Sequence, residues 1–269
     1  MKAPPFAYAK PRSLEEAFGL LERPGAKVLA GGQSLIPSLN MRLSSPELLV
    51  DIGGISSLAG IQVSGNMVRI GALTTHAQIE KSEQIRKRLS MLAEAAAQIA
   101  HPAIRNRGTL GGSLALADPA AEYPACALAL DATLVIQRKT GERRVKATDF
   151  FKGLFETDLK PGEVLAAAEF PTGGESVFLE LARQQGDYAI AGLAAHRRNS
   201  EIRLAFLGVG ATAILAKHAA AAAKRSVAAA QEALAQDLDP PADLYHSGAT
   251  KLHLARVLLG RALAQWNMN

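Results

Sequence analysis

The chain of 269 residues is long enough for one large or two modest domains, and its 48% hydrophobic content supports a buried core and argues against wholesale disorder. The net charge of +5 is mild, and the basic residues are scattered rather than clustered among stacking aromatics, which argues against nucleic-acid binding. No apolar run reaches the ~18 residues of a membrane span, and the first residues hold no apolar signal segment, so we expect a cytoplasmic protein.

The first 57 residues have the pattern of a small α/β lobe. Ser13 is expected to cap a helix, with Glu16 completing a capping box. The order strand, helix, strand then favours a parallel βαβ unit. The expected elements are a helix over 13–22, a strand over 27–30, a helix over 33–42 and a strand over 48–52.

A second lobe is expected from residue 58 to residue 171, because short hairpin patterns there alternate with helical ones. Its expected elements are a hairpin over 61–70, a helix capped by Thr75, helices over 89–100 and 121–130, a hairpin over 133–145 and a strand over 164–170. The two lobes together are expected to form one domain, and the glycine-containing stretch 171–175 is the expected linker to the next.

Residues 172–269 are expected to form a separate α+β domain. Three strand patterns in sequence favour an antiparallel sheet, and an alanine-rich run and a final amphipathic segment favour helices. The expected strands cover 177–183, 189–197 and 202–209, and the expected helices cover 211–235 and 252–264. Residues 208–213 formally fit G-x-G-x-x-A, but the βαβ context of a dinucleotide site is missing, so a simple turn is expected.

Two glycine-rich stretches are the main candidates for ligand binding. The first, 29–37, reads Leu-Ala-Gly-Gly-Gln-Ser-Leu-Ile-Pro, and the second, 104–113, ends Gly-Thr-Leu-Gly-Gly-Ser. Glycine lets another group approach the backbone closely because it has no Cβ. Successive N–H groups in such a turn can form a concave anion site. We interpret both stretches as bare turns that grip one extended, phosphate-bearing ligand from two sides.

Other polar residues give weaker signals. Cys126 is the only cysteine, so this chain can form neither an internal disulfide nor a Cys-ligated cluster. None of the six histidines has a metal-binding spacing, and no metal site is expected. Asp118 and Glu122, one helical turn apart, either pair as acid and base or cap a helix.

Four motifs occur in an order and spacing typical of one family: 30–37, 70–76 (Ile-Gly-Ala-Leu-Thr-Thr-His), 104–113 and 186–189 (Gly-Asp-Tyr-Ala). With them the chain resembles, from about residue 5 to residue 268, the FAD-binding medium subunit of the molybdenum hydroxylases, which include carbon monoxide dehydrogenase and xanthine dehydrogenase. The resemblance implies an α+β fold. It consists of a small α/β lobe, a larger lobe with antiparallel strands, and a C-terminal three-stranded antiparallel sheet with helices.

The resemblance also implies where FAD is bound, in an extended form between the two N-terminal lobes. The glycine motifs match segments that wrap the pyrophosphate and ribityl chain, and residues 99 and 100 match the adenine end. Glu122 stands where the family usually has Asp, near the ribityl side. The implied cofactor-binding residues are Leu29, Ala30, Gly31, Gly32, Gln33, Ser34, Leu35, Ile99, Ala100, Thr109, Gly111, Gly112, Ser113, Glu122, Leu165 and Tyr188, the last two beside the flavin ring.

The function implied by the resemblance is electron transfer, with no catalytic residue in this chain. Substrate is expected to be oxidised at molybdopterin on a large partner subunit. Electrons are expected to pass through [2Fe–2S] clusters on a small partner subunit to FAD and then to an external acceptor, in a dimer of heterotrimers. FAD is expected to be non-covalent, since neither glycine motif contains Cys or His. The alternatives are a stand-alone oxidase of the vanillyl-alcohol-oxidase type and a non-enzymatic nucleotide-binding module.

Overall fold

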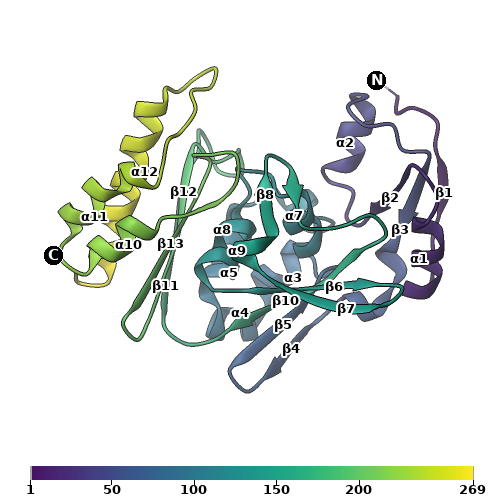
Figure 1. The fold of residues 1–269 in the computed structure, drawn as a ribbon, viewed down its shortest axis with the longest axis horizontal. Coiled ribbons are helices and arrows are strands. Elements are labelled where there is room, and N and C mark those ends of the chain that lie inside the picture. Colours follow the sequence, from purple (N-terminus) through teal and green to yellow (C-terminus); the bar gives the residue numbers. More distant parts are fainter. Residues whose placement is uncertain (1, 269) are drawn as a thin grey trace.

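A parallel three-stranded sheet forms the N-terminal lobe, in strand order β1-β3-β2 (Figure 1). The computed structural model describes residues 2–268. The elements of this lobe are β1 (Ala7–Ala9), α1 (Leu14–Leu21), β2 (Ala26–Leu29), α2 (Leu35–Asn40), β3 (Leu48–Asp51) and the 3₁₀ turns η1 (Ile52–Gly54) and η2 (Ser56–Leu58). The predicted parallel βαβ unit is therefore confirmed, with β1 added at its edge.

The start of α1 differs from prediction in one detail. The Ser13 hydroxyl accepts the N–H of Glu16 at 3.2 Å, as a cap does. The Glu16 carboxylate, however, accepts the N–H of Arg12 at 2.8 Å rather than that of Ser13. The predicted capping box is thus wrong in its second half, because the carboxylate reaches one residue further back.

An antiparallel five-stranded sheet forms the second lobe, in the order β4-β5-β10-β6-β7. Its strands are β4 (Ile61–Ser64), β5 (Met67–Gly71), β6 (Thr133–Arg138), β7 (Gly141–Lys146) and β10 (Val164–Pro171). Around it lie α3 (His76–Lys81), α4 (Glu83–Arg88), α5 (Ser90–Gln98), α6 (Pro102–Arg105), α7 (Leu110–Leu116), α8 (Glu122–Ala129), α9 (Ala147–Phe150) and the small hairpin β8 (Phe151–Gly153) and β9 (Glu156–Thr157). Both predicted hairpins and the predicted strand near 164–170 are confirmed.

The C-terminal part contains a four-stranded antiparallel sheet, not the three-stranded one expected. Its strands are β11 (Glu175–Leu181), β12 (Ala191–Arg198), β13 (Glu201–Leu207) and β14 (Ile214–Leu215), and its helices are α10 (Lys217–Ala223), α11 (Val227–Ala233), η3 (Leu234–Gln236) and α12 (Gly248–Gln265). The fourth strand pairs with β13 inside the run expected to be helical, so the helix begins at Lys217 instead of Ala211. Residues 208–213 form a turn, as expected, but β14 follows it directly instead of the expected helix.

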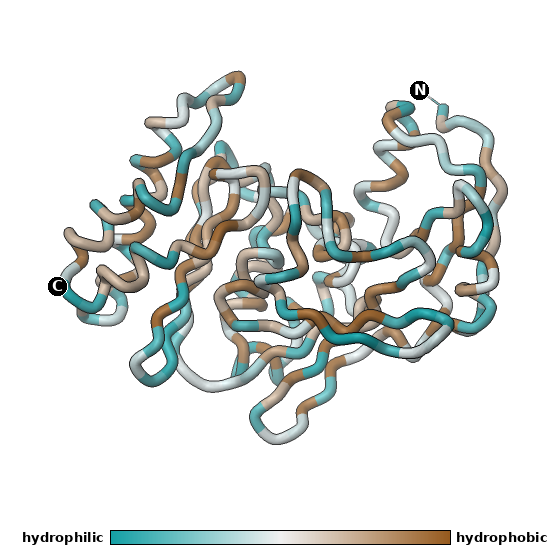
Figure 2. The backbone as a smooth tube through the Cα atoms, in the orientation of Figure 1, coloured by the Kyte–Doolittle hydropathy of each residue, from teal (hydrophilic) through white to brown (hydrophobic). Residues whose placement is uncertain are grey.

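Both faces of this C-terminal sheet are buried. Phe178, Ala194 and Ala205 pack into the core of the second lobe, on the side of α5 and α8. The neighbouring residues Leu193 and Phe206 point the other way, toward α10, α11 and α12, because side chains alternate along a strand. Figure 1 shows the sheet between these two groups of helices, and in Figure 2 the turn that joins β12 and β13 is hydrophilic. Among the described residues, no helix has the length and apolar character that crossing a membrane requires.

Candidate functional site

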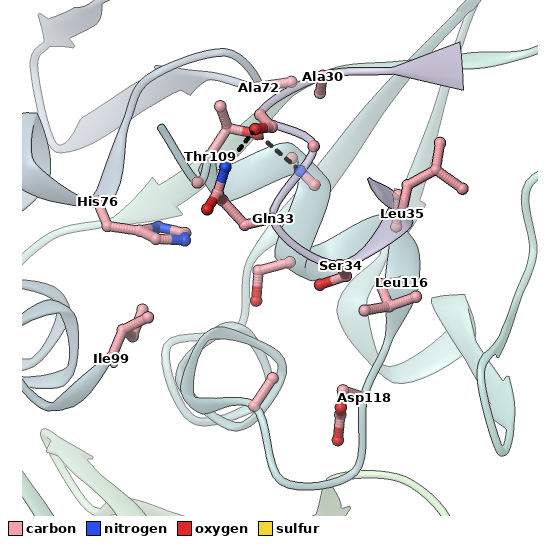
Figure 3. Close-up of a pocket in the computed structure, with 18 of the residues that line it drawn as sticks. Ala30, Gln33, Ser34, Leu35, Ala72, His76, Ile99, Thr109, Leu116 and Asp118 are labelled. Atoms are coloured by element: carbon pink, nitrogen blue, oxygen red, sulfur yellow. Dashed lines mark hydrogen bonds between the residues drawn. The ribbon is translucent and has the colours of Figure 1, made fainter. Parts of the chain in front are cut away.

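A cavity of about 540 Å³ lies where the two N-terminal lobes and the loop after β11 meet. Its walls come from the connection between β2 and α2 and from α7 (Figure 3), and also from residues of β10. Every residue predicted to bind the cofactor lines this cavity except Leu29, which ends β2 just before the first glycine motif. The fold thus gathers predicted residues from six separate stretches of sequence: 30–35, 99–100, 109–113, 122, 165 and 188.

The first glycine motif presents free hydrogen-bond donors. In the described chain, the N–H groups of Gly32, Gln33, Ser34 and Leu35 donate to no protein acceptor, and the Ser34 hydroxyl makes no capping bond at the start of α2. Gly32 has φ +74°, a conformation that favours glycine. The Gln33 side chain folds back and donates to the Gly31 carbonyl at 2.9 Å, which holds the turn in shape (Figure 3). This is the arrangement expected of a backbone anion site.

The second glycine motif is not a bare turn, contrary to our interpretation of the sequence. Gly111 and Gly112 lie in the first turn of α7, which Thr109 caps by accepting the N–H of Gly112 at 3.1 Å. The N–H of Gly111 donates to the Ala72 carbonyl at 2.8 Å. Because these N–H groups already have protein acceptors, this motif offers the cavity its hydroxyl groups, including that of Ser113, rather than an N–H cradle.

Backbone-to-backbone contact places the two motifs against each other. A Cβ on Gly31 would overlap the carbonyl oxygen of Arg107, which lies within the second motif. A Cβ on Gly111 would likewise overlap Ala72. Glycine is required at both positions because any side chain would force the segments apart. Both Gly-Gly pairs line the same cavity, as predicted.

An arginine fixes the wall formed by Ile99 and Ala100. The Arg105 guanidinium donates to the carbonyls of Ile99 and Ala100, at 3.1 and 2.9 Å, and to the Glu80 carboxylate at 2.9 Å. Ala100 has φ +42°, which is unusual for a residue with a side chain. The clamp from Arg105 accounts for how this strained turn is held.

A second arginine supports the wall that includes Leu165. Arg143 donates to the carboxylates of Glu163 and Asp158 and to the Asp158 carbonyl. Hydrogen bonds from Arg143 lower the pKa of Glu163, so this buried carboxylate is charged and paired. The segment 159–165 is thereby fixed to β7, and four of its residues line the cavity: Leu159, Glu163, Val164 and Leu165.

Tyr188 lies on the loop after β11, at the rim of the cavity, with 74% of its surface exposed. Its N–H donates to the Asp187 carboxylate at 2.9 Å, and that carboxylate also pairs with Arg183. Gly186 packs directly on the carbonyl of Ala100, with φ +81°. The loop that carries Tyr188 therefore contacts the turn clamped by Arg105.

Glu122 is the first residue of α8 and is buried at the cavity wall, where its side chain makes no hydrogen bond within the described residues. Burial, with a contribution from the nearby Glu180, raises the pKa of Glu122 to about 8. Asp118 does not pair with it: the Asp118 carboxylate accepts the N–H of Ala120 at 2.9 Å and so shapes the loop before α8. The N-cap position of α8 is occupied by Ala121, so the predicted capping role of the two acids is wrong.

His76 is a cavity residue that sequence reasoning left out of the site. It is buried against Tyr123, with ring centroids 5.3 Å apart, and its Nδ1 has no partner within the described chain. Burial, together with the charge of Arg105, lowers the pKa of His76 to about 4, so the ring is neutral at pH 7. The only signal in the sequence was its place at the end of the motif 70–76.

Comparison with known proteins identifies the family to which this chain belongs. Residues 4–173 match the FAD binding domain in molybdopterin dehydrogenase, and residues 176–266 match the CO dehydrogenase flavoprotein C-terminal domain. The chain belongs to the FAD-binding medium subunits of the molybdenum hydroxylases. It is therefore an oxidoreductase subunit, and this assignment does not favour the stand-alone oxidase of the vanillyl-alcohol-oxidase type.

Relatives of this medium subunit match it along nearly its whole length. The 6-hydroxypseudooxynicotine dehydrogenase complex subunit alpha of Paenarthrobacter nicotinovorans is 42% identical, over 98% of this chain and 95% of the relative. The carbon monoxide dehydrogenase medium chain of Hydrogenophaga pseudoflava is 37% identical, over 99% of both. A solved structure of carbon monoxide dehydrogenase from Hydrogenophaga pseudoflava superposes with a TM-score of 0.95 at 38% identity, covering 98% of both chains.

The residues of the cavity fit FAD. Unpaired N–H groups at the first glycine motif suit a diphosphate, and the apolar surfaces of Ile99, Ala100 and Leu165 suit flat rings. The cavity spans the two lobes, as an extended dinucleotide requires.

Replacing Gly31 with alanine tests the contact between the motifs. The added Cβ must displace the Arg107 carbonyl, so we expect Gly31→Ala to lower the free energy of unfolding by roughly 1–3 kcal/mol. Gly19→Ala is the matched control, because Gly19 is exposed in α1 with open space around it and alanine favours helix there by about 0.5–1 kcal/mol. Urea unfolding of both variants measures the difference. A Gly31→Ala protein as stable as wild type contradicts the close contact.

The buried carboxyl of Glu122 predicts a pH dependence of stability. Its pKa in the folded chain lies above the value of 4.5 in an unfolded chain, so its contribution is fully present below pH 4.5 and is lost as the pH rises through about 8. We expect Glu122→Gln to remove this loss, which flattens the decline in unfolding free energy between pH 5 and pH 8.5 by about 1 kcal/mol or more. Urea titrations of the FAD-free chain at several pH values measure it. Identical slopes for wild type and Glu122→Gln contradict the raised pKa.

Proposed function

We propose that this subunit binds FAD non-covalently in the cavity between its N-terminal lobes and passes electrons from [2Fe–2S] clusters on a small partner subunit to an external acceptor. A large partner subunit carries molybdopterin and oxidises the substrate. The three chains assemble as a dimer of heterotrimers in the cytoplasm. The observation that carries the proposal is the cavity itself, which places unpaired N–H donors and an apolar wall in one space.

A division into two domains near residue 172 belongs to the same proposal. The FAD-binding domain comprises residues 1–171, with lobes of about 1–57 and 58–171, and residues 172–269 form the C-terminal domain. Strands β11–β14 form a sheet of their own, and one core cluster lies wholly within residues 177–268, which supports this division.

Bound FAD supplies a flavin that accepts and releases electrons, and the chain's own residues hold it. Residues 32–35 donate backbone N–H groups to the diphosphate. Hydroxyls of Ser34, Thr109 and Ser113 donate to the diphosphate and the ribityl chain. The wall at residues 99–100 covers the adenine, while Leu165 and Tyr188 contact the flavin ring. The protein is expected to act by binding and by its local electrostatics rather than by a catalytic side chain.

Two observations support the proposal that partner subunits carry the iron–sulfur clusters and oxidise the substrate. The single cysteine, Cys126, cannot supply the thiolates of a [2Fe–2S] cluster, and it is fully buried in α8. Relatives that share the fold are named for carbon monoxide and for a nicotine-derived compound. A common flavin subunit for such different substrates is consistent with substrate chemistry on another chain.

Purification of the native complex tests the assignment. We expect this chain to co-elute with two other chains, with molybdenum, with iron and with flavin. Acid precipitation followed by filtration is expected to release all of the flavin, because nothing tethers it. Flavin that stays with the precipitate contradicts non-covalent binding. A colourless chain in the native complex contradicts the proposed function, and activity of this chain alone supports the stand-alone oxidase.

The Ser34 hydroxyl provides a finer test of the binding mode. It lines the cavity and makes no capping bond within the protein, so we expect it to donate to the ligand. Its loss in Ser34→Ala should cost about 1 kcal/mol, or about fivefold in FAD affinity. Ser64→Ala, at the exposed end of β4, is the matched control and should bind FAD like wild type. Fluorescence titration of FAD-stripped protein measures both, and equal affinities for the two variants contradict the contact.

A further inference from the structure

Glu122, which is buried, and Glu180, which is partly buried, lie where the cavity borders the C-terminal sheet. Glu122 begins α8 and lines the cavity wall, with only 9% of its surface exposed and no hydrogen-bond partner for its side chain in the described chain. Glu180 lies on β11, and its Oε2 is buried without a partner in the same part of the chain. Burial disfavours the charged form of a carboxyl, so both acids favour a bound proton, although the backbone N–H of Glu122 lowers the pKa of its own side chain in part.

The strand register places Glu180 on the side of the sheet that faces α8. Phe178, two residues earlier on β11, packs into the core built by α5 and α8, and side chains two residues apart share a face. Helix α5 contacts β11 directly, and α8 contacts the neighbouring strands β12 and β13. Gly192 of β12 pairs with both Glu180 and Leu207. The N–H of Gly208, next to Leu207, donates to the Pro119 carbonyl at 2.9 Å, shortly before α8 begins. Glu180 therefore lies at the end of the sheet that borders the start of α8.

Among the described residues, no cation contributes to the pKa shift of either carboxyl. Glu180 raises the pKa of Cys126, a buried residue of α8, and so does Glu122, so the two acids act on the same region. The titratable groups on the neighbouring elements carry no positive charge; they are Asp118, Glu94, Tyr123, Cys126 and Tyr188. On the cavity side, Asp187 is paired with Arg183. His76 is neutral, and its charged neighbour is Arg105.

We propose that Glu122 and Glu180 form a proton-binding pair that couples the redox potential of bound FAD to pH, with Glu180 acting through Glu122 as a positioning residue. The proposal rests on FAD occupying the cavity. When the pair is ionised, its negative charge stands beside the cavity and opposes the addition of electrons. When FAD is reduced by electrons from the iron–sulfur partner, the pair takes up one proton from solvent. By linkage, protonation of the pair favours reduction of FAD by the same free energy by which reduction of FAD favours protonation of the pair.

Burial and mutual repulsion both favour a proton on the pair. Burial raises the pKa of Glu180 to about 7, and burial together with the charge of Glu180 raises the pKa of Glu122 to about 8. Because the charge of one acid favours the protonated form of the other, the two acids titrate as a coupled pair. The pair changes charge between about pH 7 and pH 8, where a change in pH of the surroundings has the largest effect on the potential.

Spectroelectrochemical titration of the FAD in the assembled complex, from pH 6 to pH 9.5, tests the pair. In wild type we expect the potential to fall with an additional bend between about pH 7 and pH 8. In Glu180→Gln the bend should shift to lower pH, and in the double variant with Glu122→Gln it should be lost. Glu175→Gln, on the exposed end of the same strand, is the matched control and should follow wild type.

Infrared difference spectra of the oxidised and reduced complex at pH 8 provide a direct readout of the proton. We expect reduction to increase a C=O stretch of a protonated carboxyl, sensitive to D₂O, in wild type and in Glu175→Gln, and the signal to be absent from the double variant. If wild type and the double variant both bind FAD and have identical curves of potential against pH, the proton-binding pair is contradicted while the proposed function stands. A complex in which this chain carries no flavin overturns the proposed function instead.

Discussion

The contact between Gly31 and the backbone of Arg107 is the constraint on which the cofactor site depends. The first segment belongs to a parallel βαβ lobe and the second to a lobe built on an antiparallel sheet. Their surfaces are joined here by backbone atoms with no intervening side chain. The contact brings the free N–H groups of one lobe to the hydroxyls of the other, which makes a single cavity from two unrelated pieces of structure.

The walls of the cavity are held by polar clamps rather than by apolar packing alone. Arg105 binds the carbonyls of the turn 99–100, and Arg143 binds the carboxylates and backbone of the segment 158–163. Each guanidinium donates several hydrogen bonds in a fixed plane, which restrains a loop more firmly than a single bond does. These hydrogen bonds account for how the turn that contains the strained residue Ala100 and the segment 158–163 are held in position.

The C-terminal sheet contributes to the site as well as to stability. One of its faces covers α5 and α8, and through β11 it places Glu180 near a residue of the cavity wall. Electrostatic conditions at the cavity are thus set in part by a domain that contributes few residues to its surface. The C-terminal part of the chain thus contributes to the site by contact, through Tyr188 at the cavity rim, and in our proposal also by the charge of Glu180.

The sequence by itself determined the local elements and the family. Hairpins, the parallel βαβ unit and the two glycine motifs all rest on residues close together in the chain, where periodicity and backbone freedom act directly. It could not determine that Gly111 and Gly112 begin a helix, because the acceptor for the Gly111 N–H comes from Ala72. Nor could it reveal β14, which exists only by pairing with β13, or the proximity of Glu122 to Glu180, 58 residues apart in the numbering. Hydrogen bonds and burial between distant segments decide such features, and only the tertiary structure supplies them.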